Sequence, residues 1–216
     1  MIPRPLRAVI LDFDGVILDS NELKTEAFRE VFSRFPDHAE PMLAYHHAHV
    51  SQSRYEKFAH LVENRLGRKG DQPAIDRLAS DFAAILRGRI DTCAFVPGAR
   101  EMLEELAPRV PLYLASVTPQ PELLRLLEIH RIHRHFVRVF GCPPWTKPEA
   151  LAAIVRETGG ADRLVLVGDS AGDQRAAAAL GVAFVARDSG LPFDPPVTGV
   201  RSIFEIAVLL RTHLAA

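Results

Sequence analysis

The stretch from Arg7 to Ser20 constrains the fold of this chain more than any other part of its sequence. It reads RAVILDFDGVILDS, so an uninterrupted apolar run ends in two acids, Asp12 and Asp14, which Gly15 follows at once. Such a run is typical of a strand that is buried on both faces, as in a parallel sheet covered by helices. The sequence therefore predicts a buried strand whose carboxyl end carries two acidic side chains.

The spacing of these two acids favours a bound cation. Residues two apart on an extended chain face the same way, so Asp12 and Asp14 can converge on one point, and Gly15 permits a sharp exit from the strand. Two close carboxylates repel each other unless a proton or a cation lies between them, and hard oxygen ligands suit Mg²⁺. A single Asp-x-Asp pair is also consistent with a solvated acidic turn at a strand end.

The second half of the chain alternates between helices and apolar strands. From Val96-Pro-Gly98 onward, we expect helices at 99–107, 119–130, 148–158, 174–180 and 202–213, and strands at 110–115, 137–141, 163–167 and 182–186. Alternation of this kind predicts a parallel sheet with helices on both faces, which is an α/β fold.

Residues 19–91, in contrast, carry helical periodicity and no strand pattern. We expect a helix that ends near Pro36, a second around Pro41–His49, a third that Gly67 ends, and a fourth from Pro73 to about Gly88. Two domains follow from this pattern: an α/β core of residues 1–18 and 92–216, and an inserted helical cap of residues 19–91. A lid of this kind can exclude water and select the substrate.

Charge and composition narrow the class of partner. The net charge is −1 at pH 7 and 48% of the 216 residues are hydrophobic, so the chain can bury a core and has no general attraction for nucleic acid or acidic membranes. No apolar signal region precedes the first strand, and no stretch reaches the roughly 20 apolar residues of a membrane span. Two isolated cysteines, Cys93 and Cys142, fit a reducing compartment. We therefore expect a soluble, cytoplasmic protein that acts on a small substrate.

Three further motifs follow the first acidic stretch in order along the chain. They are Ser116 after an apolar strand, Lys147 before Pro148, and Gly168-Asp-Ser-Ala-Gly-Asp173 after Leu164-Val-Leu-Val167. Together with Asp12-Phe-Asp-Gly-Val-Ile-Leu-Asp-Ser20, they resemble the motifs of the haloacid dehalogenase-like superfamily, specifically its phosphatase branch. The resemblance spans residues 7 to about 185, with 21–91 matching only loosely. It implies a Rossmann-like parallel-sheet core with an inserted all-helical cap.

This resemblance implies catalysis through an aspartyl phosphate. Asp12 would be the nucleophile, and Asp14 would protonate the leaving alcohol and then deprotonate the attacking water. Ser116 and Lys147 would hold the non-bridging oxygens of the phosphoryl group. Lys147 also stands just before an expected helix, whose amino terminus suits anions.

The same resemblance implies a magnesium site. Asp169, with Asp173 behind it, would bind Mg²⁺ together with Asp12 and the backbone carbonyl of Asp14. Ligands of open α/β sheets bind beyond the carboxyl ends of the strands, and Asp14, Ser116 and Asp169 each follow an apolar strand. Taken singly, Asp173 also fits a cap of the helix that follows it.

Two residues of the predicted cap are candidates for substrate binding. Ser53-Arg54 resembles the Ser-Arg of the specificity loop in helical-cap sugar phosphatases and mutases, although Ser51 stands where glycine is common. Lys24 stands where sugar phosphomutases typically have histidine, which favours hydrolysis. Arg54 alone is equally consistent with a solvated arginine in a polar loop.

Several alternatives bear on the predicted activity. Dehalogenase and phosphonate-cleaving members of the superfamily lack the second acid of the first motif, so Asp14 argues against both. A sugar phosphomutase of the same superfamily and a catalytically silent binding module on the same fold stay open. The favoured interpretation is a magnesium-dependent phosphatase that hydrolyses a small phosphorylated metabolite.

Overall fold

The computed structural model describes residues 2–215 and divides into two units. Met1–Asp19 together with Ala94–Ala216 form one, here the core unit, and Ser20–Cys93 form the other, here the helical unit. These bounds lie within two residues of the division expected from the sequence. The role of the helical unit as a cap stays a prediction. No helix among the described residues is both long and apolar enough to cross a membrane.

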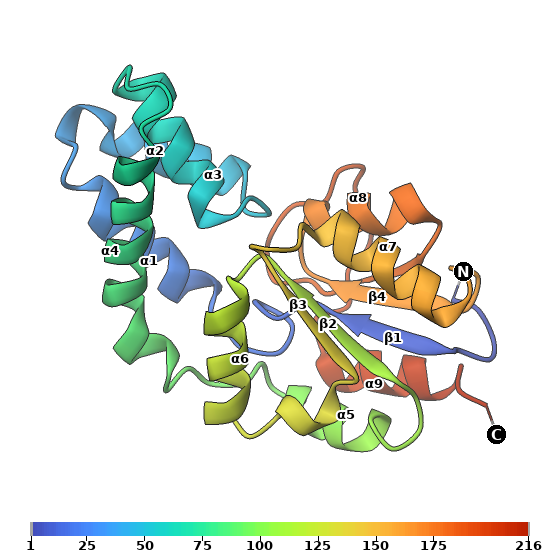
Figure 1. The fold of residues 1–216 in the computed structure, drawn as a ribbon. Helices are drawn as coiled ribbons and strands as arrows, with labels where there is room; N and C mark the ends of the chain where they lie inside the picture. The colour runs from blue at the N-terminus through green and yellow to red at the C-terminus, as the bar shows by residue number, and fades with distance from the viewer. Residues whose placement is uncertain (1, 216) are drawn as a thin grey trace. The chain divides into compact units, whose positions relative to one another are not determined.

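The core unit is built on a parallel sheet, as the alternation of helices and strands predicted (Figure 1). In the described residues the strand order is β3-β2-β1-β4-β5, with β1 in the middle. The strands are β1 (Ala8–Leu11), β2 (Leu112–Ser116), β3 (Arg138–Gly141), β4 (Leu164–Gly168) and β5 (Ala183–Ala186). Leu11 of β1 pairs with Leu114 of β2 and with Val167 of β4, so the carboxyl ends of these three strands meet at one edge.

Helices cover both faces of this sheet (Figure 1). On one face α7 (Lys147–Thr158) and α8 (Ala171–Leu180) pack together over Ala8 and Ile10. On the other face α5 (Ala99–Leu106) packs against α9 (Ile203–Arg211). The chain passes from β2 to β3 through α6 (Gln120–Ile129) and the short 3₁₀ helix η2 (His133–His135). All residues of β1, β2 and β4 are buried, which explains their continuous apolar runs.

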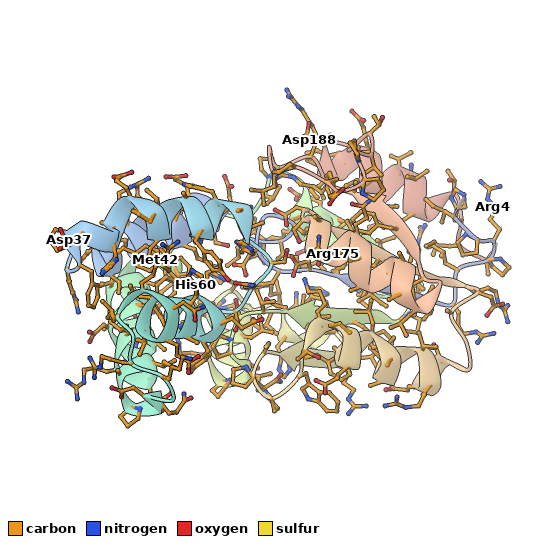
Figure 2. All side chains as sticks on the ribbon, turned by 90° about the horizontal axis from the view of Figure 1, so that it is seen from above. Arg4, Asp37, Met42, His60, Arg175 and Asp188 are labelled. Atoms are coloured by element: carbon orange, nitrogen blue, oxygen red, sulfur yellow. The ribbon has the colours of Figure 1, made fainter. Side chains whose placement is uncertain are left out.

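The helical unit contains no strand, and all of its residues are described. Its elements are α1 (Asn21–Phe32), α2 (Pro36–Ala48), α3 (Arg54–Ala59), the π-helix η1 (His60–Arg65) and α4 (Gln72–Ile90). Phe28 lies at the centre of an aromatic cluster, with its ring centroid 4.4 Å from that of Phe82 and 5.6 Å from that of Phe58. In Figure 2, Met42 lies within this unit, where it is fully buried, whereas Asp37 projects outward near the start of α2.

Several helix boundaries differ from the sequence predictions, by up to five residues at the start of α2. The second helix begins at Pro36 and contains Pro41, because proline is favoured in the first turn and Pro41 removes only one backbone hydrogen bond. The fourth helix continues through Gly88 to Ile90. Helix α8 begins three residues earlier than expected, since Ser170 and Asp173 form a capping box at its amino terminus.

Candidate active site

Four buried aspartates occupy the carboxyl edge of the sheet. Asp12 and Asp14 follow β1, Asp169 follows β4, and Asp173 lies in the first turn of α8. The parallel pairing of β1 and β4 continues beyond the strands, because the backbone N–H of Asp12 donates to the carbonyl of Val167 at 2.9 Å. As a result, carboxylate oxygens of Asp12, Asp169 and Asp173 all lie within 4.8 Å of one another. We call these three residues the carboxylate cluster.

Lys147 forms ion pairs with two members of this cluster. Its ammonium group donates to Oδ1 of Asp12 at 2.8 Å and also to Oδ1 of Asp173, and its side chain is only 8% exposed. Lys147 is the first residue of α7, whose start is fixed by a capping box between Thr146 and Glu149. Burial alone would lower the pKa of Lys147, but the two carboxylates outweigh burial and raise it. The ammonium group therefore stays charged.

The negative charge of these acids exceeds what Lys147 can balance. Burial raises the pKa of Asp12 well above its ordinary range, the carboxylate of Asp173 raises it further, and Asp169 and Asp14 add to the effect against the opposing charge of Lys147. Such a group of carboxylates needs a proton or a further cation to be stable. Three buried carboxylates with oxygens this close are the hard ligands that Mg²⁺ prefers, so the residues present fit a divalent cation.

Asp173 also organises the start of α8. Its Oδ2 accepts hydrogen bonds from the backbone N–H of Ser170 at 3.1 Å and from the hydroxyl of Ser170 at 2.6 Å. A Cβ at position 168 would lie 2.4 Å from the Cβ of Asp173, so only glycine fits there. The sequence allowed two interpretations of Asp173, an acid of the metal site and a cap of the following helix, and one side chain can serve both.

Ser116 and Asp14 are linked by a residue that the sequence analysis missed. Ser116 is the last residue of β2 rather than the first residue after it, and its Oγ accepts a hydrogen bond from the backbone N–H of Thr118 at 3.0 Å. The hydroxyl of Thr118 donates to Oδ2 of Asp14 at 3.1 Å, and Thr118 is 1% exposed. The sequence signal for Thr118 was its position two residues after Ser116 at the end of an apolar strand, since residues two apart can face the same way.

The two remaining candidates belong to the helical unit. Arg54 is the first residue of α3, follows the N-cap residue Ser53, and is 7% exposed, with its guanidinium carbon 4.6 Å from the ring centroid of Phe82. Lys24 lies in the first half of α1 and is half-buried. The structure therefore brings together Asp12, Asp14, Ser116, Lys147, Asp169 and Asp173 in the core unit. The roles of Lys24 and Arg54 stay predictions.

Comparisons with known proteins agree with this architecture. The family model of haloacid dehalogenase-like hydrolases matches residues 6–181. A search of curated proteins found no match. Among solved structures, a haloacid dehalogenase-like family hydrolase from Streptococcus pneumoniae is similar with a TM-score of 0.72 and 17% identity, covering 95% of this chain and 98% of its own.

Two further solved structures carry more specific descriptions. A candidate beta-phosphoglucomutase from Thermotoga maritima is similar with a TM-score of 0.70 and 21% identity, over 97% of this chain and all of its own. A predicted phosphoglycolate phosphatase from Haemophilus somnus has a TM-score of 0.69 and 15% identity, over 89% of this chain and 90% of its own. At these identities the likeness is one of fold.

Proposed function

Because this chain belongs to the haloacid dehalogenase-like hydrolase family, we propose that it is a magnesium-dependent phosphatase that hydrolyses a small phosphate monoester through an aspartyl phosphate. The observation that carries this proposal is the carboxylate cluster, in which Lys147 forms ion pairs with Asp12 and Asp173 while Asp14 is close enough to act on the charge of Asp12. The sequence holds two cysteines, Cys93 and Cys142, which are too few and too isolated for a disulfide framework, and this suits a reducing compartment, the cytoplasm.

The proposed nucleophile is Asp12. One of its carboxylate oxygens attacks the phosphorus atom of the ester, a new O–P bond forms, and the bond from phosphorus to the leaving oxygen breaks. Lys147 donates to Oδ1 of Asp12 and so restrains the rotation of this carboxyl group. A fixed orientation raises the fraction of time that the carboxylate spends in a geometry suited to attack.

The proposed acid and base is Asp14. It gives its proton to the leaving alcohol, and it later takes a proton from the water that attacks the aspartyl phosphate and releases inorganic phosphate. Its place two residues after Asp12 puts both carboxyl groups at the same end of β1. Asp14 is buried, so bulk water does not compete freely for its proton.

Ser116 and Lys147 are proposed to bind the phosphoryl oxygens. The hydroxyl oxygen of Ser116 accepts a hydrogen bond from the backbone N–H of Thr118, so the hydroxyl proton of Ser116 can be donated to a phosphoryl oxygen. Asp12, Asp169 and Asp173, with the backbone carbonyl of Asp14, would hold Mg²⁺, which would neutralise charge on the phosphoryl group. Magnesium thereby also relieves the excess negative charge of the cluster.

A turnover assay tests this function. We expect the purified protein to hydrolyse para-nitrophenyl phosphate and some members of a panel of small phosphate monoesters in Mg²⁺, and to lose this activity in EDTA. Asp12→Asn should retain less than about a hundredth of the activity, since an amide is a poor nucleophile. A folded protein that turns over no ester would instead favour a binding module, and a product with a relocated phosphoryl group would favour a mutase.

Arg54 is proposed to recognise the part of the substrate that lies away from the transferred phosphoryl group. Its planar guanidinium can bind an oxyanion or a pair of hydroxyl groups, and Lys24 is a second candidate for such a contact. Arg54→Ala should lower kcat/KM for the best ester of the panel by about ten- to a hundredfold, the loss of one charge-assisted hydrogen bond. Para-nitrophenyl phosphate serves as the control, and an equal loss with it would mean that Arg54 supports the fold instead.

A further inference from the structure

Thr118 occupies a position in the core unit from which it contacts both the proposed acid and a proposed phosphoryl-binding residue. Its hydroxyl donates to Oδ2 of Asp14 at 3.1 Å, across 104 positions of sequence. Its backbone N–H donates to Oγ of Ser116 at 3.0 Å. One residue therefore ties the turn after β2 to the end of β1.

The backbone of Thr118 is itself held from a third side. Its carbonyl accepts a hydrogen bond from the N–H of Cys142 at 3.0 Å. A Cβ at position 141 would lie 2.7 Å from the same carbonyl oxygen, so glycine at 141 allows the end of β3 to approach this closely. A β-branched side chain with 1% exposure has little rotational freedom, and the hydroxyl of Thr118 is thus presented in one direction.

We propose that Thr118 is a positioning residue that orients the carboxyl group of Asp14 for proton transfer to the leaving group. The inference rests on the proposed function, because it assigns Thr118 a part in the acid step of that reaction. The hydroxyl of Thr118 donates to Oδ2 of Asp14 and so restrains the rotation of this carboxyl group. Thr118 thereby helps to fix the direction in which Asp14 presents its proton.

Thr118 would act in one step of the reaction, the protonation of the leaving oxygen. As the bond between phosphorus and the leaving oxygen breaks, its electron pair goes to the leaving oxygen, and the proton of the Asp14 carboxylic acid moves to that oxygen. Without the hydroxyl of Thr118 the carboxyl group loses one hydrogen bond that restrains its orientation, and its proton faces the leaving oxygen for a smaller part of the time. The loss should therefore be greatest for leaving groups that need the proton most.

Two substitutions at position 118 separate the hydroxyl from the shape of the side chain. Thr118→Val keeps the branched shape and removes the hydroxyl, whereas Thr118→Ser keeps the hydroxyl. Thr158→Val is the matched control, because it removes a hydroxyl that donates to the carbonyl of Ile154 within α7. Thermal unfolding of all three variants establishes that each is folded.

Single-turnover rates of phosphoryl transfer provide the first measurement. For an alkyl phosphate, Thr118→Val should be about ten- to a hundredfold slower, with KM changed less than about twofold. For para-nitrophenyl phosphate, whose leaving group needs little protonation, the loss should be below about threefold, and Thr118→Ser should stay within about threefold of wild type for both. An equal loss with both esters, or a folded Thr118→Ser variant as slow as Thr118→Val, would overturn the assignment.

Crystal structures of the same two variants provide a measurement that does not depend on turnover. We expect the carboxyl group of Asp14 to rotate in Thr118→Val and to keep its orientation in Thr118→Ser. An unrotated Asp14 in Thr118→Val would contradict the positioning role, whatever the activity. Absence of all turnover in the wild type would instead refute the proposed phosphatase function, and the two failures are therefore distinguishable.

Discussion

At the scale of single residues, the net charge at the carboxyl edge of the sheet depends on the number of carboxylates that lie near the ammonium group of Lys147. Asp12, Asp14, Asp169 and Asp173 are all buried, and burial together with the neighbouring acids raises the pKa of Asp12. Removing one of these acids has two opposite effects. It relieves repulsion in the folded protein, and it weakens the proposed magnesium site.

Asp12→Asn should therefore separate stability from activity. In EDTA, the variant should melt about 2–4 °C above wild type, corresponding to ~1 kcal/mol of relieved repulsion in a chain of this size. Adding Mg²⁺ should raise the melting temperature of the wild type more than that of the variant, because ligand binding stabilises the folded state. Scanning calorimetry in EDTA and in Mg²⁺ measures both; a variant that melts lower in EDTA would mean that the ion pair with Lys147 outweighs the repulsion.

A second prediction at this scale concerns Gly168. An alanine Cβ there would lie 2.4 Å from Cβ and 2.5 Å from Cγ of Asp173, so Asp173 must leave the carboxylate cluster or the start of α8 must shift. We expect Gly168→Ala to be about 1–3 kcal/mol less stable and to lose most of its phosphatase activity. Urea unfolding and the para-nitrophenyl phosphate assay measure these effects.

The control for this substitution lies in the helical unit. Gly88 is inside α4, and nothing lies within 4 Å of a Cβ built on it. Gly88→Ala should leave activity unchanged and add about 0.5–1 kcal/mol of stability, because alanine loses less backbone entropy in a helix. Equal effects of the two substitutions would show that the contact with Asp173 is unimportant.

At the scale of elements, the helical unit is held together by a buried polar chain as well as by its aromatic cluster. The ammonium group of Lys57 lies 3.1 Å from Nδ1 of His46, and Nε2 of His46 lies 3.1 Å from the hydroxyl of Thr25, which donates to the carbonyl of Asn21. Because an ammonium group only donates, Nδ1 accepts and the neutral ring carries its proton on Nε2. This chain joins α1, α2 and α3 through groups that require an uncharged His46.

The stability of this unit should consequently fall in mild acid. Burial lowers the pKa of His46 to about 3, with further contributions from the positive charges of Lys57, His47 and Arg29. The unfolded chain takes up this proton near pH 6.5, so between the two values the unfolded state binds more protons. The free energy of unfolding then falls as the pH falls, by up to about 1.4 kcal/mol per pH unit.

His46→Gln tests this dependence because it removes the titrating ring. Between pH 7 and pH 5, the wild type should lose about 2 kcal/mol more stability than the variant, measured by urea unfolding. His47→Gln, a change at the neighbouring exposed position, is the control and should retain the pH dependence of the wild type. If the wild type and His46→Gln lost stability in parallel, the titration of His46 would not contribute.

At the scale of the whole molecule, the chain leaves the core unit and returns to it at neighbouring positions. Leu18 forms an antiparallel bridge with Phe95, the N–H of Asp19 donates to the carbonyl of Ala94 at 3.0 Å, and the N–H of Val96 donates to the carbonyl of Ile17 at 2.9 Å. This ladder belongs entirely to the core unit. The two segments pair like the strands of a hairpin, and the helical unit takes the place of the hairpin loop.

Replacing Ser20–Cys93 with Asn-Gly should therefore leave a core unit that folds, because this dipeptide closes two-residue hairpin loops. We expect cooperative thermal unfolding and residual hydrolysis of para-nitrophenyl phosphate. Discrimination among the esters of the panel should shrink, since the helical unit is predicted to be a lid that selects the substrate. Circular dichroism and the ratio of kcat/KM values measure these outcomes; a shortened chain without a cooperative transition would show that the core unit needs the helical unit to fold.

The sequence was sufficient for the features that depend on local pattern. A buried strand needs a continuous apolar run, so β1 and the acids at its end could be located from residues 7–14 alone, and the alternation of helices and strands identified the parallel sheet. The capping box of Ser170 and Asp173 also depends only on residues that are close in sequence, although the sequence prediction placed the start of α8 three residues too late.

Tertiary structure alone decided how side chains from distant segments meet. The bond from Thr118 to Asp14, the ion pairs of Lys147 and the approach of Asp173 to Gly168 depend on strand register and on the residue at which α7 and α8 begin. No periodicity of a single segment encodes these, because a hydrophobic period reports which face is buried and not which side chain lies opposite. Contact between sites a hundred residues apart is a property of the packed chain.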